Sequence, residues 1–109
     1  MATTIWLNVS LSNSLSKKKK LKITILNDNY GDAFRNLCKT VNEKLLKLDS
    51  SAEISKPEMV YKPETDLDGD ENTLEDFRDL EGMLEEYPGG GGVRVIVAIN
   101  GKFWMYTVL

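Results

Sequence analysis

The feature that most constrains the fold of this chain is a pair of amphipathic β-strand patterns at its N-terminus. In residues 4–12 and again in residues 20–26, apolar and polar side chains alternate with a period of two. One face of the first run carries Ile5, Leu7, Val9 and Leu11, and one face of the second carries Leu21, Ile23 and Ile25. The opposite face of the first run carries Trp6, Asn8 and Ser10, because residues two apart in a strand share a face. A short polar link joins the runs, so they predict a β-hairpin with one face that other elements must cover.

The segment after the hairpin predicts a helix that could provide this cover. From Ala33 to Leu48 the apolar residues recur at the spacing of a helix that buries one stripe; they are Phe34, Leu37, Cys38, Val41, Leu45 and Leu48. Asp32 is the predicted N-cap, because an aspartate oxygen can accept a hydrogen bond from a first-turn N–H.

The second half of the chain predicts shorter elements. A strand is expected within 58–63, and helical turns after the acidic stretch, where the apolar residues are Leu74, Phe77, Leu80 and Leu84. The glycines at 89–92 predict a flexible loop. Residues 93–99 are apolar at nearly every position, which is typical of a central strand covered on both faces. Asn100 and Gly101 predict a final hairpin turn.

The resulting order is β, β, α, β, acidic loop with helical turns, β, β. It predicts an α+β fold in which a mixed sheet packs on one main helix, with an extra C-terminal hairpin strand. A length of 109 residues is that of one domain, so we expect residues 1–109 to form a single unit. Because the chain starts at Met1 and ends directly after the last strand, we expect it to be the N-terminal module of a longer protein.

The composition argues against several kinds of chemistry. The chain has no histidine and a single cysteine, Cys38, on the predicted buried stripe. An intramolecular disulfide, a Cys/His zinc site and an imidazole base are therefore excluded, and we expect neither an enzyme nor a cofactor. No apolar run approaches the roughly 20 residues of a membrane span, and no signal peptide is visible, so we expect a cytoplasmic protein.

The net charge of −3 hides a strong segregation of charge. Residues 1–50 hold nine Lys/Arg and four Asp/Glu, whereas residues 51–109 hold five and thirteen. The basic side chains concentrate in one tract, Lys17, Lys18, Lys19, Lys20 and Lys22. Such asymmetry bears on association with partners. A purely solubilising role for the lysines remains open. An acidic chain without aromatics in the basic tract argues against nucleic acid as the partner.

The acidic stretch has one interpretation as a calcium loop. Oxygen ligands and a glycine recur at the spacing of an EF-hand loop in residues 64–75; they are Glu64, Asp66, Asp68, Gly69, Asn72 and Glu75. However, Pro63 precedes the loop and an entering helix is not predicted. Calcium binding by the Glu64–Glu75 loop is therefore the alternative function.

The same stretch resembles the acidic motif of the Phox/Bem-one domain, a ubiquitin-like β-grasp domain. The motif, Asp-x-Asp-Gly-Asp followed by an aliphatic residue and an acidic-Leu pair, is matched by Asp66, Asp68, Gly69, Asp70, Leu74, Asp79 and Leu80. The resemblance spans roughly residues 5–99. It implies a scaffold or adaptor module in which Asp66, Asp68, Asp70 and Asp79 bind a basic cluster on another protein, which can be a second copy. The basic cluster here would be Lys17, Lys18, Lys19, Lys20 and Lys22.

The chain also departs from that family's pattern. Leu67 stands where the family usually has an acidic residue, and Phe77 where it usually has an aspartate. The ubiquitin-like class as a whole, including doublecortin-like members, therefore stays open beside the one family.

Overall fold

The computed structural model describes residues 2–46 and 57–98, and it begins with the predicted hairpin. Strands β1 (Ala2–Leu11) and β2 (Lys19–Leu26) pair antiparallel, with Leu7 opposite Leu21. All the predicted apolar positions are buried except Leu11, which is half-buried. The period of two therefore fixed both the pairing and the face that points into the core.

Helix α1 (Tyr30–Lys44) follows, three residues earlier than the sequence predicted. Its N-cap is Asn29, and the prediction of Asp32 was wrong. The Oδ1 of Asn29 accepts the N–H of Asp32 at 3.1 Å, and the amide of Asn29 donates to the Asp32 carboxylate at 3.0 Å. Asp32 thus lies inside the first turn, where its negative charge interacts favourably with the positive end of the helix dipole.

The remaining strands complete a five-stranded mixed sheet with the order β2-β1-β5-β3-β4. Strand β5 (Val93–Val97) is buried at every position and lies parallel to β1 and antiparallel to β3 (Met59–Pro63). This confirms the prediction of a central strand. The two-residue strand β4 (Asn72–Thr73) was not predicted, because so short a polar segment has no periodicity to detect.

A second helix and a short 3₁₀ turn connect β4 to β5. Helix α2 (Phe77–Glu86) buries Leu80 and Met83, and the 3₁₀ turn η1 (Pro88–Gly90) follows it. The predicted helical stripe was partly wrong: Leu74 is buried before the helix begins, and Phe77 is 44% exposed. The sheet packs against two helices, α1 and α2, instead of the one main helix expected.

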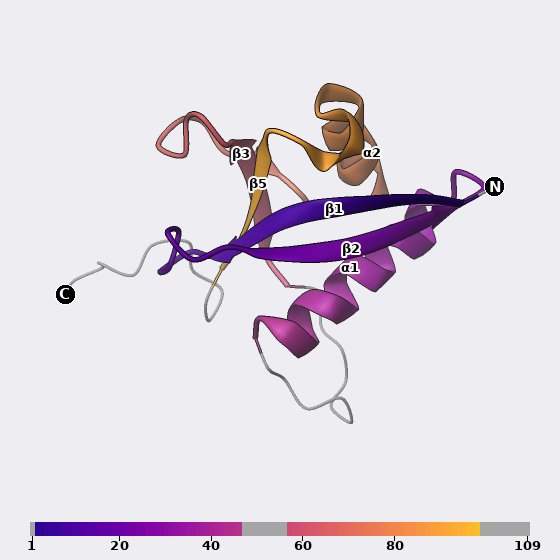
Figure 1. The fold of residues 1–109 in the computed structure, drawn as a ribbon, viewed down its shortest axis with the longest axis horizontal. Helices are drawn as coiled ribbons and strands as arrows, with labels where there is room; N and C mark the ends of the chain where they lie inside the picture. Colours follow the sequence, from indigo (N-terminus) through magenta and orange to yellow (C-terminus); the bar gives the residue numbers. More distant parts are fainter. Residues whose placement is uncertain (1, 47–56, 99–109) are drawn as a thin grey trace.

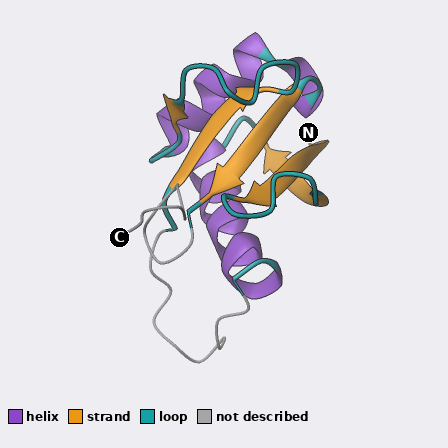
Figure 2. Cartoon of the chain, turned by 90° about the vertical axis from the view of Figure 1, so that its left-hand side faces the viewer, coloured by secondary structure: helices purple, strands orange, loops and turns teal. Residues whose placement is uncertain are grey.

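One hydrophobic core unites these elements. It lies on the face of the sheet that α1 covers and includes Leu7, Ile23, Leu37, Val41 and Val95. In Figure 1 the hairpin β1–β2 passes in front of α1, and in Figure 2 helices lie behind the strands that face the viewer. The other face of the hairpin is turned away from α1.

The fold is thus α+β with a mixed sheet. In the part of the chain that the structure describes, neither helix has the length and apolar character needed to cross a bilayer. Leu48 and the predicted hairpin turn at Asn100 and Gly101 lie outside the described residues.

We expect the effect of hairpin substitutions on stability to depend on whether the side chain is buried or exposed. Leu7 is 0% exposed, so Leu7→Ala should lower the free energy of unfolding by about 2–5 kcal/mol. Leu26 is 59% exposed on the same hairpin, so Leu26→Ala should change it by less than about 0.5 kcal/mol. Urea unfolding followed by circular dichroism measures both, and equal effects would contradict the burial described.

Candidate functional site

The first candidate surface is the acidic loop, residues 64–71, between β3 and β4. Asp66, Asp68 and Asp70 are all exposed on it. Two consecutive turns shape the loop: the N–H of Asp66 donates to Pro63 at 3.0 Å, and the N–H of Gly69 donates to Asp66 at 3.1 Å. A side chain at Gly69 would bring a Cβ within 2.8 Å of the Asp66 Cγ and displace that carboxylate. The glycine therefore leaves room for the Asp66 carboxylate at its observed position.

Neighbouring strands hold the base of the acidic loop. The Lys62 ammonium donates to the carbonyl of Leu67 at 2.9 Å, which places one positive charge under the loop. The N–H of Glu64 donates to the carbonyl of Gly92 at 2.9 Å. The loop thus carries its aspartates on a backbone that is bonded to two other segments.

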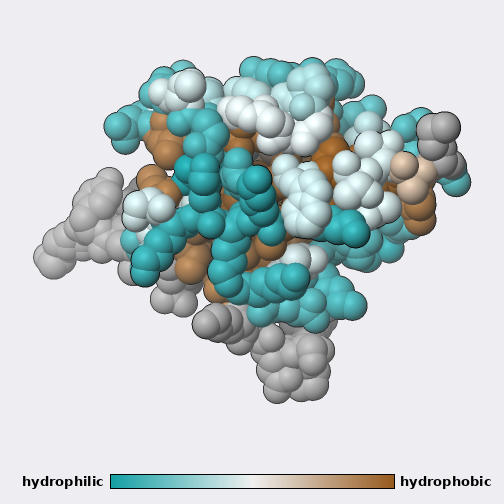
Figure 3. Space-filling model, in the orientation of Figure 1, coloured by the Kyte–Doolittle hydropathy of each residue, from teal (hydrophilic) through white to brown (hydrophobic). Residues whose placement is uncertain are grey.

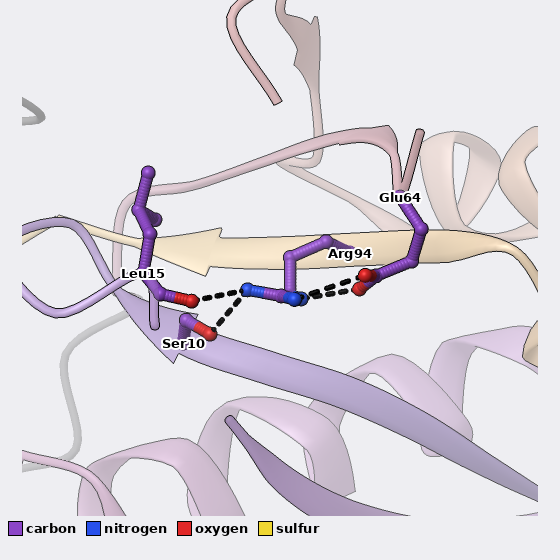
Figure 4. Close-up of polar contacts among 4 residues, drawn as sticks. All are labelled: Ser10, Leu15, Glu64 and Arg94. Carbon is purple, nitrogen blue, oxygen red and sulfur yellow. Dashed lines mark hydrogen bonds and ion pairs between the residues drawn. The ribbon is translucent and has the colours of Figure 1, made fainter. Parts of the chain in front are cut away.

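A buried arginine ties this loop to the β1–β2 connection (Figure 4). Arg94 on β5 is 6% exposed, and its guanidinium forms a bidentate ion pair with Glu64, with Nη2 and Oε2 2.9 Å apart. The Nη1 of Arg94 donates to the hydroxyl of Ser10 at 2.9 Å and to the carbonyl of Leu15 at 2.6 Å. A buried charge needs such partners to offset the loss of hydration. Arg94 therefore connects the start of the acidic loop, at Glu64, to the β1–β2 connection that precedes the lysine tract, at Leu15.

Sequence analysis did not identify this role of Arg94. It interrupts an apolar strand, and the pattern alone could only be read as a covered central strand. A single charged residue inside such a run is the one hint, because it must find a partner once the strand is buried.

The contacts of Glu64 bear on the calcium alternative. Glu64 is the first ligand position of that loop, and Arg94 binds both of its carboxylate oxygens. A strand, β3, leads into the loop where an EF-hand needs a helix. Within residues 2–46 and 57–98, no three His, Cys, Asp or Glu side chains cluster as they would around a metal ion. These observations give the calcium alternative no support.

Asp79 has a structural task besides any binding role. The carboxylate of Asp76, the N-cap of α2, accepts the N–H groups of Arg78 and Asp79 at 2.9 and 3.0 Å. In return, Oδ2 of Asp79 accepts the N–H of Glu75 at 2.8 Å. This reciprocal arrangement resembles a capping box. One Asp79 oxygen therefore stabilises the start of α2.

Carboxylates of α2 influence the ionisation of a tyrosine in the sheet. Burial raises the pKa of Tyr61 on β3 above its ordinary value of 10.0, and the carboxylates of Glu86 and Asp79 raise it further. The ring of Tyr61 packs edge-to-face on Tyr87, with centroids 6.4 Å apart. Asp79 therefore contributes to the electrostatic field at Tyr61 even with one oxygen in the cap.

The second candidate surface is the lysine tract, which the strand divides between two faces. Lys20 and Lys22 are exposed and alternate with the buried Leu21 and Ile23, so they point away from α1. Lys19 points the other way, and its ammonium lies 3.4 Å from the Lys44 carbonyl at the end of α1. Lys17 and Lys18 precede β2 and are also exposed. The five lysines of the sequence prediction therefore do not share one face.

The lysines that point outward lie beside an exposed tryptophan. Across the hairpin, Lys20 is opposite Asn8 and Lys22 is opposite Trp6. The side chain of Trp6 is 53% exposed. We call these four residues the outer hairpin face; Figure 3 shows this side of the molecule, where hydrophilic side chains surround small apolar areas. The sequence placed Trp6 on the outer side of the strand but gave no reason to single it out.

The glycine segment supports the backbone of Trp6. Gly90 is buried, and a Cβ there would come within 2.7 Å of the Trp6 carbonyl oxygen. Its φ of +81° also favours glycine. The sequence predicted a flexible loop at 89–92, whereas the structure forms η1 here and packs it on β1.

The two charged surfaces belong to opposite edges of the sheet. Strand β2 is one edge strand and β4, which follows the acidic loop, is the other. Among residues 2–46 and 57–98 the ion pairs are Arg35 with Asp32 and Arg94 with Glu64. The aspartates and lysines predicted to bind a partner take part in neither of these two pairs.

A groove between α1 and the start of α2 is a further surface that the sequence did not indicate. It has a volume of about 730 Å³, and its apolar part includes Phe34, Cys38 and the exposed Phe77. Cys38 is buried, as predicted for a core residue. The aspartates of the acidic loop and the lysine tract do not line this groove.

Comparison of the chain with protein-family models, with curated proteins and with solved structures found no match. The arguments about function therefore rest on the geometry above.

The ion pair of Arg94 leads to a first prediction for this site. Glu64→Gln leaves the buried guanidinium without its counter-charge, so we expect the free energy of unfolding to fall by about 1–3 kcal/mol. Glu71→Gln makes the same change at an exposed position of the same loop and should cost less than about 0.5 kcal/mol. Urea unfolding compares the two variants; equal costs would show that the Arg94 contact is not stabilising.

A second prediction concerns alkaline pH. Because the folded-state pKa of Tyr61 lies above 10.0, the folded protein holds this proton more tightly than the unfolded chain. The associated stability is complete below pH 10.0 and is lost as the pH rises through the folded-state pKa. Tyr61→Phe should therefore reduce the loss of stability in that range, and Glu86→Gln should reduce it less. Urea unfolding on both sides of pH 10.0 tests this, and a Phe variant with the wild-type decline would refute it.

Proposed function

We propose that this chain is a ubiquitin-like β-grasp interaction domain of the Phox/Bem-one type, acting in the cytoplasm as a scaffold or adaptor module without catalysis. Its acidic loop would dock on the outer hairpin face of another protein domain, and a second copy of the same chain fits that description.

The topology supports the fold assignment. An N-terminal hairpin is followed by one long helix across the sheet, and the last described strand lies parallel to the first in the centre. The acidic loop joins β3 to β4, ahead of α2. The Phox/Bem-one family has its acidic motif between its third and last strands. The order of elements and the place of the motif therefore both agree with the proposal.

The observation that carries the functional proposal is the presence of two exposed surfaces of opposite charge at opposite edges of one sheet. Asp66, Asp68 and Asp70 crowd one loop, where like charges repel one another. Lysines of a partner would relieve this repulsion and steer the encounter. A domain with complementary surfaces at two edges would associate head to tail. If the rotation between successive copies does not return to the first copy and close a ring, the copies would form open filaments.

The geometry also ranks the residues predicted from the sequence. Lys20 and Lys22 share the outer hairpin face and are the best placed to meet carboxylates, while Lys17 and Lys18 flank them. Lys19 has its ammonium near the end of α1, and Asp79 has one oxygen in the helix cap. We therefore assign the main contact to Asp66, Asp68 and Asp70 with Lys20 and Lys22.

Two charge reversals test this proposal. Wild-type protein should self-associate at low ionic strength and dissociate at high ionic strength, because salt screens the exposed charges. Asp68→Lys removes the acidic side of the contact and Lys20→Glu the basic side, so each variant alone should be monomeric. An equimolar mixture should form dimers that do not grow further, because each variant keeps one intact surface. Sedimentation velocity measures all these species.

Lys19→Glu provides the matched control. It makes the same charge change one residue away but on the α1 side of β2, so it should weaken association far less than Lys20→Glu. Equal effects of the two reversals would contradict the assigned face. A wild-type protein that stays monomeric at low ionic strength and high concentration would refute docking between copies.

A further inference from the structure

The outer hairpin face carries a large aromatic ring as well as its lysines. Trp6 on β1 is 53% exposed and lies directly opposite Lys22. No hydrogen bond of its indole N–H is found with any residue in 2–46 or 57–98. A large aromatic ring with a free donor is the type of side chain that most often anchors protein interfaces.

The acidic loop also carries an apolar residue among its aspartates. Leu67 stands between Asp66 and Asp68, and its side chain is half-buried. The hydrogen bond from Lys62 to the Leu67 carbonyl fixes the backbone at this point of the loop. The part of Leu67 that is exposed therefore lies next in sequence to both aspartates that the proposal assigns to the contact.

We infer that, in the docked pair, Leu67 of one copy packs on the indole ring of Trp6 of the next, within a surround of Asp–Lys pairs. This inference rests on the proposed docking of two copies and names its central contact. The indole N–H of Trp6 would donate to a carboxylate beside Leu67, so the loop satisfies both the apolar and the polar parts of the ring.

Energetics favour such a centre. Exposed ion pairs contribute little affinity each, about 0–1 kcal/mol, because water and salt screen them. The lysines and aspartates would therefore bring the copies together in the correct orientation. The burial of Trp6 against Leu67 would then slow their separation, because interface strength is concentrated in a few central aromatic contacts.

The dimer formed by the two charge-reversal variants allows a direct test. In that dimer the Asp68→Lys copy provides the outer hairpin face and the Lys20→Glu copy provides the acidic loop. Trp6→Ala in the first copy and Leu67→Ala in the second should each raise the Kd, the former by about 10-fold or more. When both substitutions are present in the dimer, the Kd should rise by clearly less than the product of the two separate fold-changes, because both substitutions remove the same contact. Isothermal titration calorimetry at several salt concentrations measures these constants.

Exchange of the two substitutions between the copies is the control. Trp6→Ala in the Lys20→Glu copy and Leu67→Ala in the Asp68→Lys copy lie on surfaces that the dimer leaves free, so the Kd should not change. The salt dependence of the Kd should also persist in Trp6→Ala, and Trp6→Phe should recover part of the affinity. Circular dichroism verifies that each variant folds.

The outcomes separate the two proposals. If the charge-reversal variants form no dimer, docking between copies fails and the contact fails with it. If the dimer forms but Trp6→Ala and Leu67→Ala in their assigned copies leave the Kd within about 2-fold, or have fully multiplicative effects, the contact is refuted while charge-driven docking stands.

Discussion

The placement of β5 between β1 and β3 is the constraint on which the arrangement of both charged surfaces depends. Every side chain of β5 is buried, so the strand gains most in the centre of the sheet, where both of its edges are paired. Its parallel pairing with β1 leaves β2 on one edge and moves β3, β4 and the acidic loop to the other. The separation of basic and acidic side chains along the sequence thereby becomes a separation in space.

Arg94 shows how this central strand also holds the two charged segments. It places a guanidinium under the first residues of the acidic loop and beside the β1–β2 connection, and it is bonded to Glu64, Ser10 and Leu15. A bidentate pair of this kind fixes geometry as well as charge. The exposed aspartates of the loop thus stand on a base that is anchored in the core, which limits the freedom they would lose on binding.

The pleat of β2 decides which lysines can act together. Five lysines lie within six positions of the sequence, yet successive side chains of a strand point to opposite faces. Lys20 and Lys22 therefore join Trp6 and Asn8, whereas Lys19 approaches the carbonyl end of α1, where a cation is favoured. A basic tract in a sequence is thus a smaller patch in the folded domain than its length suggests.

The sequence alone determined the hairpin, the long helix, the buried central strand and the segregation of charge, because each depends on a local period or on composition. It could not supply the strand order or β4. It also missed the N-cap at Asn29, the task of Asp79 in capping α2 and the ion pair between Glu64 and Arg94, residues 30 positions apart. The cap depends on local geometry that one residue type does not specify. The strand order and the Arg94 contacts join segments that only the packed core brings together. Tertiary structure likewise decided that Trp6 and Leu67 stay exposed or half-buried, since exposure depends on which neighbours cover a side chain.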